Sequence, residues 1–560
     1  MPESPTAALL TNRDDLDPGG YDVVVIGGGV NGLAVAREAA MSGLSVLLLE
    51  RDDIGGQTSS ISTRLIHGGL KYLERLDMSL VFESIREQRR LLRDAPHLVH
   101  SYPMLIPFYR NNTRPGWLLS CGLAVYKLLT GGKLRTRLVG PRRLAREWPS
   151  IDKNGLRRGA IFDDAQVPWT ERLCVELAVS AQAHGGHILT RADVHEVIVE
   201  GRVATAVRFS GPRGSRTARA RVVVNAAGPW VDDVLATTGV VSPRPTAEPL
   251  VGPTKGSHLV VDPFPGAPAT CVFFEARADG RPVFVLPWAG RYMVGSTDLP
   301  YTGSLDLITA DDGEIDYLLD ETNQLIPEAR LDRASVLWSY SGVRPLPYVS
   351  GMTDPATVTR GHLVVPQSKG IANVVTVIGG KFTTHRALGE DVVASVFASL
   401  GRTPVPSPTH DAPFPGAPVR AGYASVAEMT SALQAEWGGR LGENVVQRLA
   451  ALYGSRAHQV AALVETDPHL AQTVDPDSGA IAAEVAFAVT CEGAVSLEDI
   501  LLRRILVGLN GDVGISAAPA VADVTALYLG WDEDTKADEI NAYLAATKRF
   551  QPRASEWRDD

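Results

Sequence analysis

A glycine-rich turn near the N-terminus constrains the fold of this chain more than any other feature. The apolar run at residues 23–26 leads directly into Gly-Gly-Gly-Val-Asn-Gly at residues 27–32, which fits the spacing G-x-G-x-x-G. A second apolar run at residues 45–49 ends at Glu50, about 20 residues after the glycines. Strand, turn, helix, strand and acid in this order predict a parallel βαβ unit that binds a dinucleotide.

Each part of this motif has a physical role in binding a pyrophosphate. Gly27 permits a sharp turn, Gly29 lets the backbone approach the phosphates, and Gly32 allows the helix to pack closely on the sheet. The helix N-terminus adds partial positive charge beside the phosphates. We expect Glu50 to accept hydrogen bonds from ribose hydroxyls. A tight turn without a ligand is the alternative, and the combined spacing disfavours it.

Further segments indicate a large ligand that is held along its whole length. Residues 51–74 are richer in glycine and hydroxyl side chains than an ordinary core segment. Residues 221–230 and 374–386 each run from an apolar strand into small residues or a Gly-Gly turn. Strand ends that converge in this way suit FAD better than a nicotinamide cofactor, which must dissociate in each cycle.

These segments resemble the quinone-linked, FAD-dependent glycerol-3-phosphate dehydrogenases. The most specific block is residues 58–74, Thr-Ser-Ser-Ile-Ser-Thr-Arg-Leu-Ile-His-Gly-Gly-Leu-Lys-Tyr-Leu-Glu. The resemblance implies that FAD accepts a hydride from sn-glycerol 3-phosphate, that dihydroxyacetone phosphate is formed, and that electrons pass to a quinone. The other matching blocks are residues 26–32, 225–230, 255–258, 295–298, 340–346 and 379–384.

The chain departs from the family pattern at several positions. Lys71 stands where the family usually has arginine, His385 where it has tyrosine, and Trp-Thr-Glu-Arg-Leu at residues 169–173 where it has Asp-Asp-Ala-Arg-Leu. An oxidase, or a dehydrogenase of a longer polyol phosphate such as erythritol phosphate, therefore stays open. A noncatalytic or tRNA-modifying flavoprotein is an alternative of another class. The acidic pI and the set of Arg344, Arg360 and Lys381 disfavour it.

Oxidation of an alcohol that carries a phosphate group needs an anion clamp. Arg344 and Arg360 are candidates, because a guanidinium offers paired donors that match phosphate oxygens. We expect Lys71 and Tyr72 to complete the clamp, with Lys71 acting as a point charge where an arginine would make a forked contact. A structural salt bridge is the alternative for each arginine.

The reaction also needs a base for the hydroxyl proton, and the resemblance places His258, Arg344 and Lys381 near the flavin. Histidine, with an ordinary pKa of about 6.5, accepts a proton at neutral pH, whereas lysine needs its pKa lowered by burial or by nearby cations. Arg344 would stabilise the forming alkoxide. The alternatives are a core histidine bonded to backbone for His258 and contact with the flavin pyrimidine edge for Lys381.

The motif, the following loop and the resemblance together define an expected set of FAD-binding residues. It contains Gly27, Gly28, Gly29, Asn31, Gly32, Glu50, Thr58, Ser59, Ser62, His67, Gly68, Gly69, Ala227, Gly228, Trp230, Gly379, Gly380, Lys381 and Thr383.

The length and pattern of the chain predict an α/β protein with a Rossmann-like FAD-binding domain. A mainly antiparallel β substrate domain is inserted into it, and a C-terminal α-helical domain follows a proline-rich segment. The expected parts are a flexible lead at 1–20, a discontinuous FAD-binding domain at 21–400, substrate-domain insertions at about 75–190 in part and 250–340, a linker at 401–420 and helices at 421–560.

Charge and cysteine usage bound the partners of the protein. A net charge of −10 and a pI near 5.7 argue against nucleic acid as a partner. The four cysteines are far apart, which predicts no metal site and reduced thiols in the cytoplasm. The apolar run at residues 117–126, flanked by basic residues, is too short to span a bilayer. The run predicts either a core helix or peripheral contact with the inner face of the cell membrane. The resemblance favours the membrane contact. Whether the protein forms a homodimer stays open.

Overall fold

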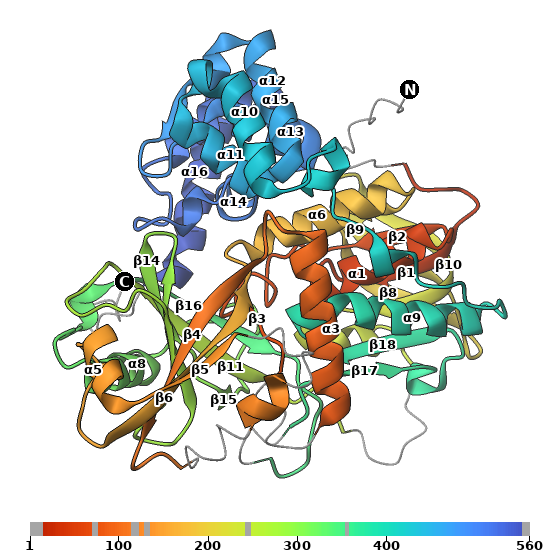
Figure 1. Ribbon diagram of the computed structural model, residues 1–560. Coiled ribbons are helices and arrows are strands. Elements are labelled where there is room, and N and C mark those ends of the chain that lie inside the picture. The colour runs from red at the N-terminus through yellow and green to blue at the C-terminus, as the bar shows by residue number, and fades with distance from the viewer. Residues whose placement is uncertain are drawn as a thin grey trace.

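The computed structural model describes residues 15–69, 77–113, 122–127, 135–240, 248–352 and 358–551. Figure 1 shows two sheet-containing lobes side by side and a layer of helices from the C-terminal part of the chain above them. The expected architecture is confirmed: a Rossmann-like lobe, a mainly antiparallel β lobe and a C-terminal helical region.

The first sheet is built around the glycine-rich turn. Its order is β17-β18-β10-β1-β2-β7; neighbours from β18 to β7 run parallel, and β17 is antiparallel to β18. The apolar strands β1 and β2 are buried, as expected for central parallel strands covered on both faces. The strands are β1 (Tyr21–Ile26), β2 (Val46–Leu49), β7 (His187–Leu189), β10 (Gly214–Asn225), β17 (His362–Val365) and β18 (Val374–Gly379), with β8 (Asp193–Glu200) and β9 (Val203–Gly211) forming an antiparallel ribbon on β10.

Helices cover this sheet and share one apolar core. Side chains of α1 (Val30–Met41), α6 (Thr170–Ala183) and α9 (His385–Ser399) pack together with those of β1 and β2. Helix α3 (Met78–Asp94) begins at Asp77, whose side chain accepts from the Leu80 N–H, and α7 is Val231–Ala236. This packing holds the start of α1 against the ends of the parallel strands.

The second, larger sheet forms the other lobe. Its neighbours are antiparallel except for β12 and β4, which run parallel, so the predicted mainly antiparallel sheet is confirmed. Helix α8 (Asp312–Leu325) and helix α5 (Pro141–Glu147) pack on one face. The strands are β3 (Leu65–Ile66), β4 (His100–Tyr109), β5 (Thr136–Val139), β6 (Leu156–Gln166), β11 (Thr254–Val261), β12 (Cys271–Glu275), β13 (Pro282–Trp288), β14 (Arg291–Gly295), β15 (Leu299–Pro300) and β16 (Val336–Arg344).

The proline-rich segment at residues 401–420 lies against the first lobe. The Arg37 side chain of α1 donates to the Ala412 carbonyl over 2.8 Å and stacks on the buried Phe414 ring. The chain then enters the helical region, which also contains the short hairpin β19 (Thr473–Asp475) and β20 (Ala480–Ile481). Its helices are α10 (Val426–Leu441), α11 (Glu443–Tyr453), α12 (Ala457–Thr466), α13 (Ala482–Glu492), α14 (Leu497–Asp499), α15 (Ala518–Leu529) and α16 (Glu533–Thr547).

Buried ion pairs join the helical region to the first lobe. Asp53, which follows the second strand, accepts from Arg503 over 2.6 Å and from Arg504 over 2.8 and 2.9 Å. These arginines hold the pKa of Asp53 below its usual range although burial acts in the opposite direction. The loop after Glu50 is therefore held by the C-terminal helices.

The apolar run at residues 117–126 lies partly outside the described residues. Of the described part, Leu123 and Tyr126 are buried and Val125 is exposed. Within the described ranges, none of the helices has the length and apolar character needed to cross a bilayer.

Replacing Arg504 with methionine should destabilise the protein by about 3–5 kcal/mol, because Asp53 would lose a buried partner. The midpoint of thermal unfolding measures the effect. The control is Arg208→Met, whose exposed pair with Glu196 is worth less than about 1 kcal/mol. Equal shifts in the two variants would contradict a stabilising role for the buried pair.

Candidate active site

A cavity of about 870 Å³ lies between the two lobes. The ends of β1, β2 and β18 and the residues that follow β10 line it on one side, and residues of β11, β13 and β16 line it on the other. Ligands of open parallel sheets bind at the carboxyl ends of the strands. The predicted convergence of the three returning segments on one ligand site is therefore consistent with their positions in the structure.

The glycine turn has the geometry that its motif predicts. Gly27 adopts a φ of +109°, in the region that favours glycine. A Cβ on Gly32 would lie 1.9 Å from the Gly27 carbonyl oxygen, so α1 packs directly on the turn. Gly29 lines the cavity at the N-terminus of α1, where backbone N–H groups favour an anion.

Glu50 is held at the end of β2 by backbone donors. Its carboxylate accepts from the Gly28 N–H over 2.5 Å and from the Asp52 N–H over 2.8 Å. Burial raises the pKa of Glu50 to about 7. Next to it, the Arg51 guanidinium lies 4.5 Å from the centre of the Trp230 ring, and both residues line the cavity.

Most of the residues expected to bind FAD line this cavity. Others support its wall: Gly28 donates to Glu50, Gly32 contacts Gly27, and a Cβ on Gly68 would lie 1.6 Å from the Tyr126 hydroxyl. Gly69 adopts a φ of +93°. The lining members of the set are Gly27, Gly29, Asn31, Glu50, Thr58, Ser59, Ser62, His67, Ala227, Gly228, Trp230, Gly379, Gly380, Lys381 and Thr383.

The polar groups of the wall fit a dinucleotide. Asn31 donates to the Gly379 carbonyl over 2.9 Å, while its buried Oδ1 has no hydrogen-bond partner among the described residues. The Ser59 hydroxyl accepts from the Val30 N–H over 2.9 Å and so orders the start of α1. The helix N-terminus that lines the cavity and the glycines without room for side chains match the phosphates of a dinucleotide, and the free acceptor matches a hydrogen-bond donor on the same ligand.

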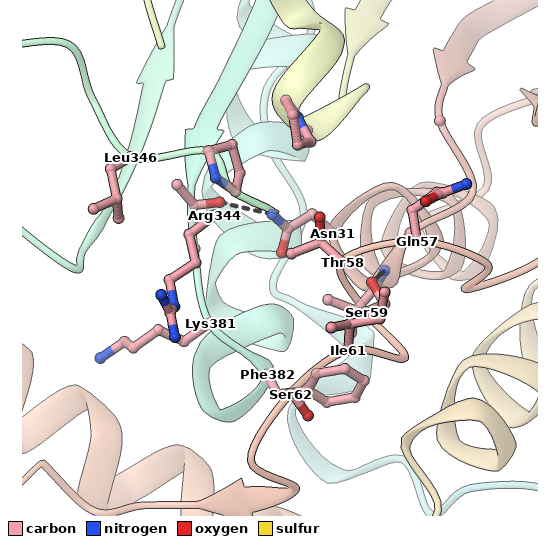
Figure 2. Close-up of a pocket in the computed structure, with 18 of the residues that line it drawn as sticks. Asn31, Gln57, Thr58, Ser59, Ile61, Ser62, Arg344, Leu346, Lys381 and Phe382 are labelled. Atoms are coloured by element: carbon pink, nitrogen blue, oxygen red, sulfur yellow. Dashed lines mark hydrogen bonds between the residues drawn. The ribbon is translucent and has the colours of Figure 1, made fainter. Parts of the chain in front are cut away.

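One end of the cavity carries the predicted basic residues. Arg344, the last residue of β16, donates to Asp298 Oδ1 over 2.9 Å and to the Ser296 hydroxyl over 3.0 Å. Arg360 donates to Asp298 Oδ2 over 2.5 Å. In Figure 2, the Arg344 and Lys381 side chains lie on one side of the pocket, and Gln57 and Ser59 lie on the other.

His258 lies in β11 beside this basic end and lines the cavity. Its Nε2 is 2.9 Å from the Thr63 hydroxyl, and its ring stacks on Tyr340 with 4.8 Å between centroids. Burial, together with Arg344 and Arg64, lowers the pKa of His258 to about 3. The imidazole is therefore neutral at pH 7, and its buried Nδ1 has no hydrogen-bond partner in the described part of the chain.

Lys381 follows β18 and reaches helix α3, where its Nζ donates to the Ser84 hydroxyl over 3.1 Å. Burial lowers the pKa of Lys381 to about 8. Lys71 and Tyr72, the other predicted clamp residues, lie outside the described residues, so their roles stay predictions.

For several residues of this site, no role was predicted from the sequence. Asp298 joins Arg344 to Arg360, Thr63 bonds to His258, and a Cβ on Gly256 would lie 2.2 Å from Arg344 Nη2. Arg281 also lines the cavity. Asp298, Thr63 and Gly256 belong to the matching sequence blocks, which was the available signal, but their partners are far away in the chain.

The unusual segment at residues 169–173 contacts other parts of the protein. Glu171 forms a buried bidentate pair with Arg64, with both distances 2.7 Å. Arg172 pairs with Glu492 of the helical region over 2.5 and 2.7 Å. The charged residues of the segment therefore have a structural role: Glu171 binds the loop that contains Arg64, and Arg172 binds the helical region.

Comparisons with known proteins identify the family of the chain. Residues 22–394 match the family described as FAD dependent oxidoreductase, and residues 407–536 match the C-terminal domain of alpha-glycerophosphate oxidase. The chain therefore belongs to the FAD-dependent oxidoreductases, and FAD is its cofactor.

Individual relatives narrow the family further. A glycerol-3-phosphate dehydrogenase from a Synechocystis species is 40% identical over 545 residues, covering 95% of this chain and 97% of the relative. A D-erythritol 1-phosphate dehydrogenase from Brucella abortus is 37% identical, covering 87% of this chain and 94% of the relative. Within the oxidoreductases, the chain belongs to the glycerol-3-phosphate dehydrogenase family, as the sequence blocks predicted.

A solved structure shows the same fold. The glycerol-3-phosphate dehydrogenase from Bacillus halodurans, complexed with FAD, superposes with a TM-score of 0.78 at 24% identity. The superposition covers 97% of this chain and 98% of that chain.

Gly32→Ala should weaken FAD binding by at least about fivefold, because overpacking a rigid contact costs about 1–3 kcal/mol. The flavin absorbance per mole of purified protein measures the retained cofactor. Gly439→Ala is the control, since it also lies in a helix and nothing lies within 4 Å of its Cβ position. Full FAD content in Gly32→Ala would contradict the assigned contact.

Proposed function

We propose that this protein oxidises sn-glycerol 3-phosphate to dihydroxyacetone phosphate and passes the electrons to a quinone. The observation that carries the proposal is the juxtaposition of Arg344, Arg360 and His258 at one end of a cavity whose other wall is the dinucleotide turn. A phosphate dianion fits the arginine pair, and an alcohol on the same substrate lies within reach of a neutral imidazole. The names of the relatives support this substrate class.

Different residues of the chain have different roles in the proposed reaction. Bound FAD supplies a hydride acceptor. Arg344 and Arg360 hold the phosphate group and thereby fix the position of the alcohol carbon. Arg344 also stabilises the negative charge that develops on the substrate oxygen.

Two groups can accept the hydroxyl proton. His258 is neutral at pH 7 and keeps Nδ1 without a partner among the described residues, but its lowered pKa makes it the weaker base of the two. Lys381, with its pKa lowered to about 8 by burial, is neutral in part at that pH. When Lys381 carries its proton, its positive charge would instead help to hold FAD and favour hydride transfer to it.

The second candidate is a dehydrogenase of a longer polyol phosphate. The Brucella abortus relative is named for D-erythritol 1-phosphate, and Lys71 changes the expected clamp. Steady-state kinetics with glycerol 3-phosphate and erythritol phosphate, each with a soluble quinone or oxygen as acceptor, separates the alternatives. A higher kcat/KM for glycerol 3-phosphate with the quinone supports the proposal, and a higher value for erythritol phosphate or for oxygen contradicts it.

A quinone acceptor implies contact with the membrane in which the quinone is dissolved. We therefore propose peripheral binding at the inner face of the cell membrane. Co-sedimentation of the protein with lipid vesicles tests this part of the proposal, and protein that stays in the supernatant at every lipid concentration contradicts it.

Arg344→Ala should lower kcat/KM for the phosphate substrate by about 100-fold, because a charge-assisted contact to an anion is lost. FAD content should stay normal, since the guanidinium contacts Asp298, Ser296 and Thr297 beside the proposed phosphate position. Arg333→Ala, which removes a surface arginine paired with Asp312 and Asp316, serves as the control. Equal kinetics in the two variants would contradict the clamp.

A further inference from the structure

Arginines from separate elements converge on Asp298, which follows strand β14. Arg344 at the end of β16 and Arg360 before β17 each donate to a different oxygen of its carboxylate, over 2.9 and 2.5 Å. Arg281, which precedes β13, donates to the backbone carbonyl of Asp298. All of these residues line the cavity. Asp298 therefore links donors that the chain brings in from distant positions.

Asp298 stays ionised in this setting. Burial alone would raise the pKa of its carboxyl, but the positive charges of Arg344 and Arg360 outweigh burial and lower the pKa. Asp298 is a permanent negative charge between two guanidinium groups at pH 7.

Arg344 and Arg360 differ in how firmly they are anchored. The Arg344 guanidinium lies against the Gly256 backbone, where a Cβ would be 2.2–2.6 Å from its atoms. It also donates to the Ser296 hydroxyl and the Thr297 carbonyl. Arg360 is tied to this group through the Asp298 carboxylate. Among the described residues, Arg360 donates only to this carboxylate, whereas Arg344 would keep Ser296 and Thr297 if the carboxylate were lost.

We propose that Asp298 is the positioning residue of the phosphate clamp, holding Arg360 beside Arg344 so that both guanidinium groups meet one phosphate group. This inference rests on the proposed function, because it assumes a phosphate-bearing substrate at this end of the cavity. A guanidinium carries five N–H donors, so Arg360, which binds the carboxylate through Nη2, retains donors for phosphate. Arg344 uses both Nη atoms for Asp298, Ser296 and Thr297 and retains its Nε–H. The carboxylate acts through Arg360 and does not itself hold the anion.

Asp298→Asn tests the proposal, since it removes the charge and keeps the shape of the side chain. We expect KM for glycerol 3-phosphate to rise about tenfold, as for loss of one charge-assisted hydrogen bond, with kcat changed less than about twofold. Calorimetric titration of the oxidised holoenzyme with inorganic phosphate should show about tenfold weaker binding. An unchanged or tighter affinity for phosphate would overturn the proposal, as would loss of FAD from the variant.

Asp22→Asn is the matched control. Asp22 also binds two arginines, Arg221 over 3.0 Å and Arg402 over 3.2 Å, but it lies at the start of β1, away from the cavity lining. KM and phosphate affinity should stay at wild-type values. A rise in KM equal to that of Asp298→Asn would show a general effect of removing a shared carboxylate and would overturn the proposal.

A double-mutant cycle with Arg360→Met separates positioning from a general structural effect. If Asp298 acts through Arg360, the double variant binds phosphate about as weakly as Arg360→Met alone. A double variant in which the two single effects multiply would overturn the proposal. A wild-type protein that binds inorganic phosphate but does not oxidise glycerol 3-phosphate would contradict the proposed function, while the cycle would still test the role of Asp298.

Discussion

The contact between Gly27 and Gly32 sets the position of the rest of the cofactor lobe. Because no side chain separates them, helix α1 begins directly at the end of strand β1 and points its N-terminus into the cavity. Helices α6 and α9 pack on α1 and share its apolar core. Larger residues at either glycine would move the helix, its N-terminal donors and the neighbouring strand ends together.

Buried ion pairs between carboxylates and arginines are the second organising feature of the structure. Asp53 and Glu492 each accept three hydrogen bonds from arginines in buried surroundings, and Glu171 accepts two. Such pairs strongly penalise loss of one partner, because the other charge stays buried. The Asp53 pairs couple the C-terminal helices to the loop after Glu50, and the Glu492 pair couples them to helix α6. The helical region therefore supports the cofactor site without lining the cavity at those positions.

The sequence allowed the fold class and much of the site to be predicted because their signals are local. The glycine spacing, the apolar strands and the block that contains Arg344 can be read over a few residues. The partners of those residues could not be predicted in this way: Asp298 meets Arg360 only after distant strands pair, and Gly256 matters because a guanidinium lies on its backbone. The roles of Lys71 and Tyr72 rest on the resemblance alone.

The central claim is that a phosphate-bearing alcohol at the arginine end of the cavity reduces the bound flavin. Anaerobic addition of glycerol 3-phosphate to the purified holoenzyme, with the absorbance near ~450 nm followed over time, tests this claim most directly, because oxidised flavin absorbs there. The account predicts bleaching and the formation of one dihydroxyacetone phosphate per flavin. A flavin that stays oxidised with glycerol 3-phosphate, and with erythritol phosphate as well, would contradict it.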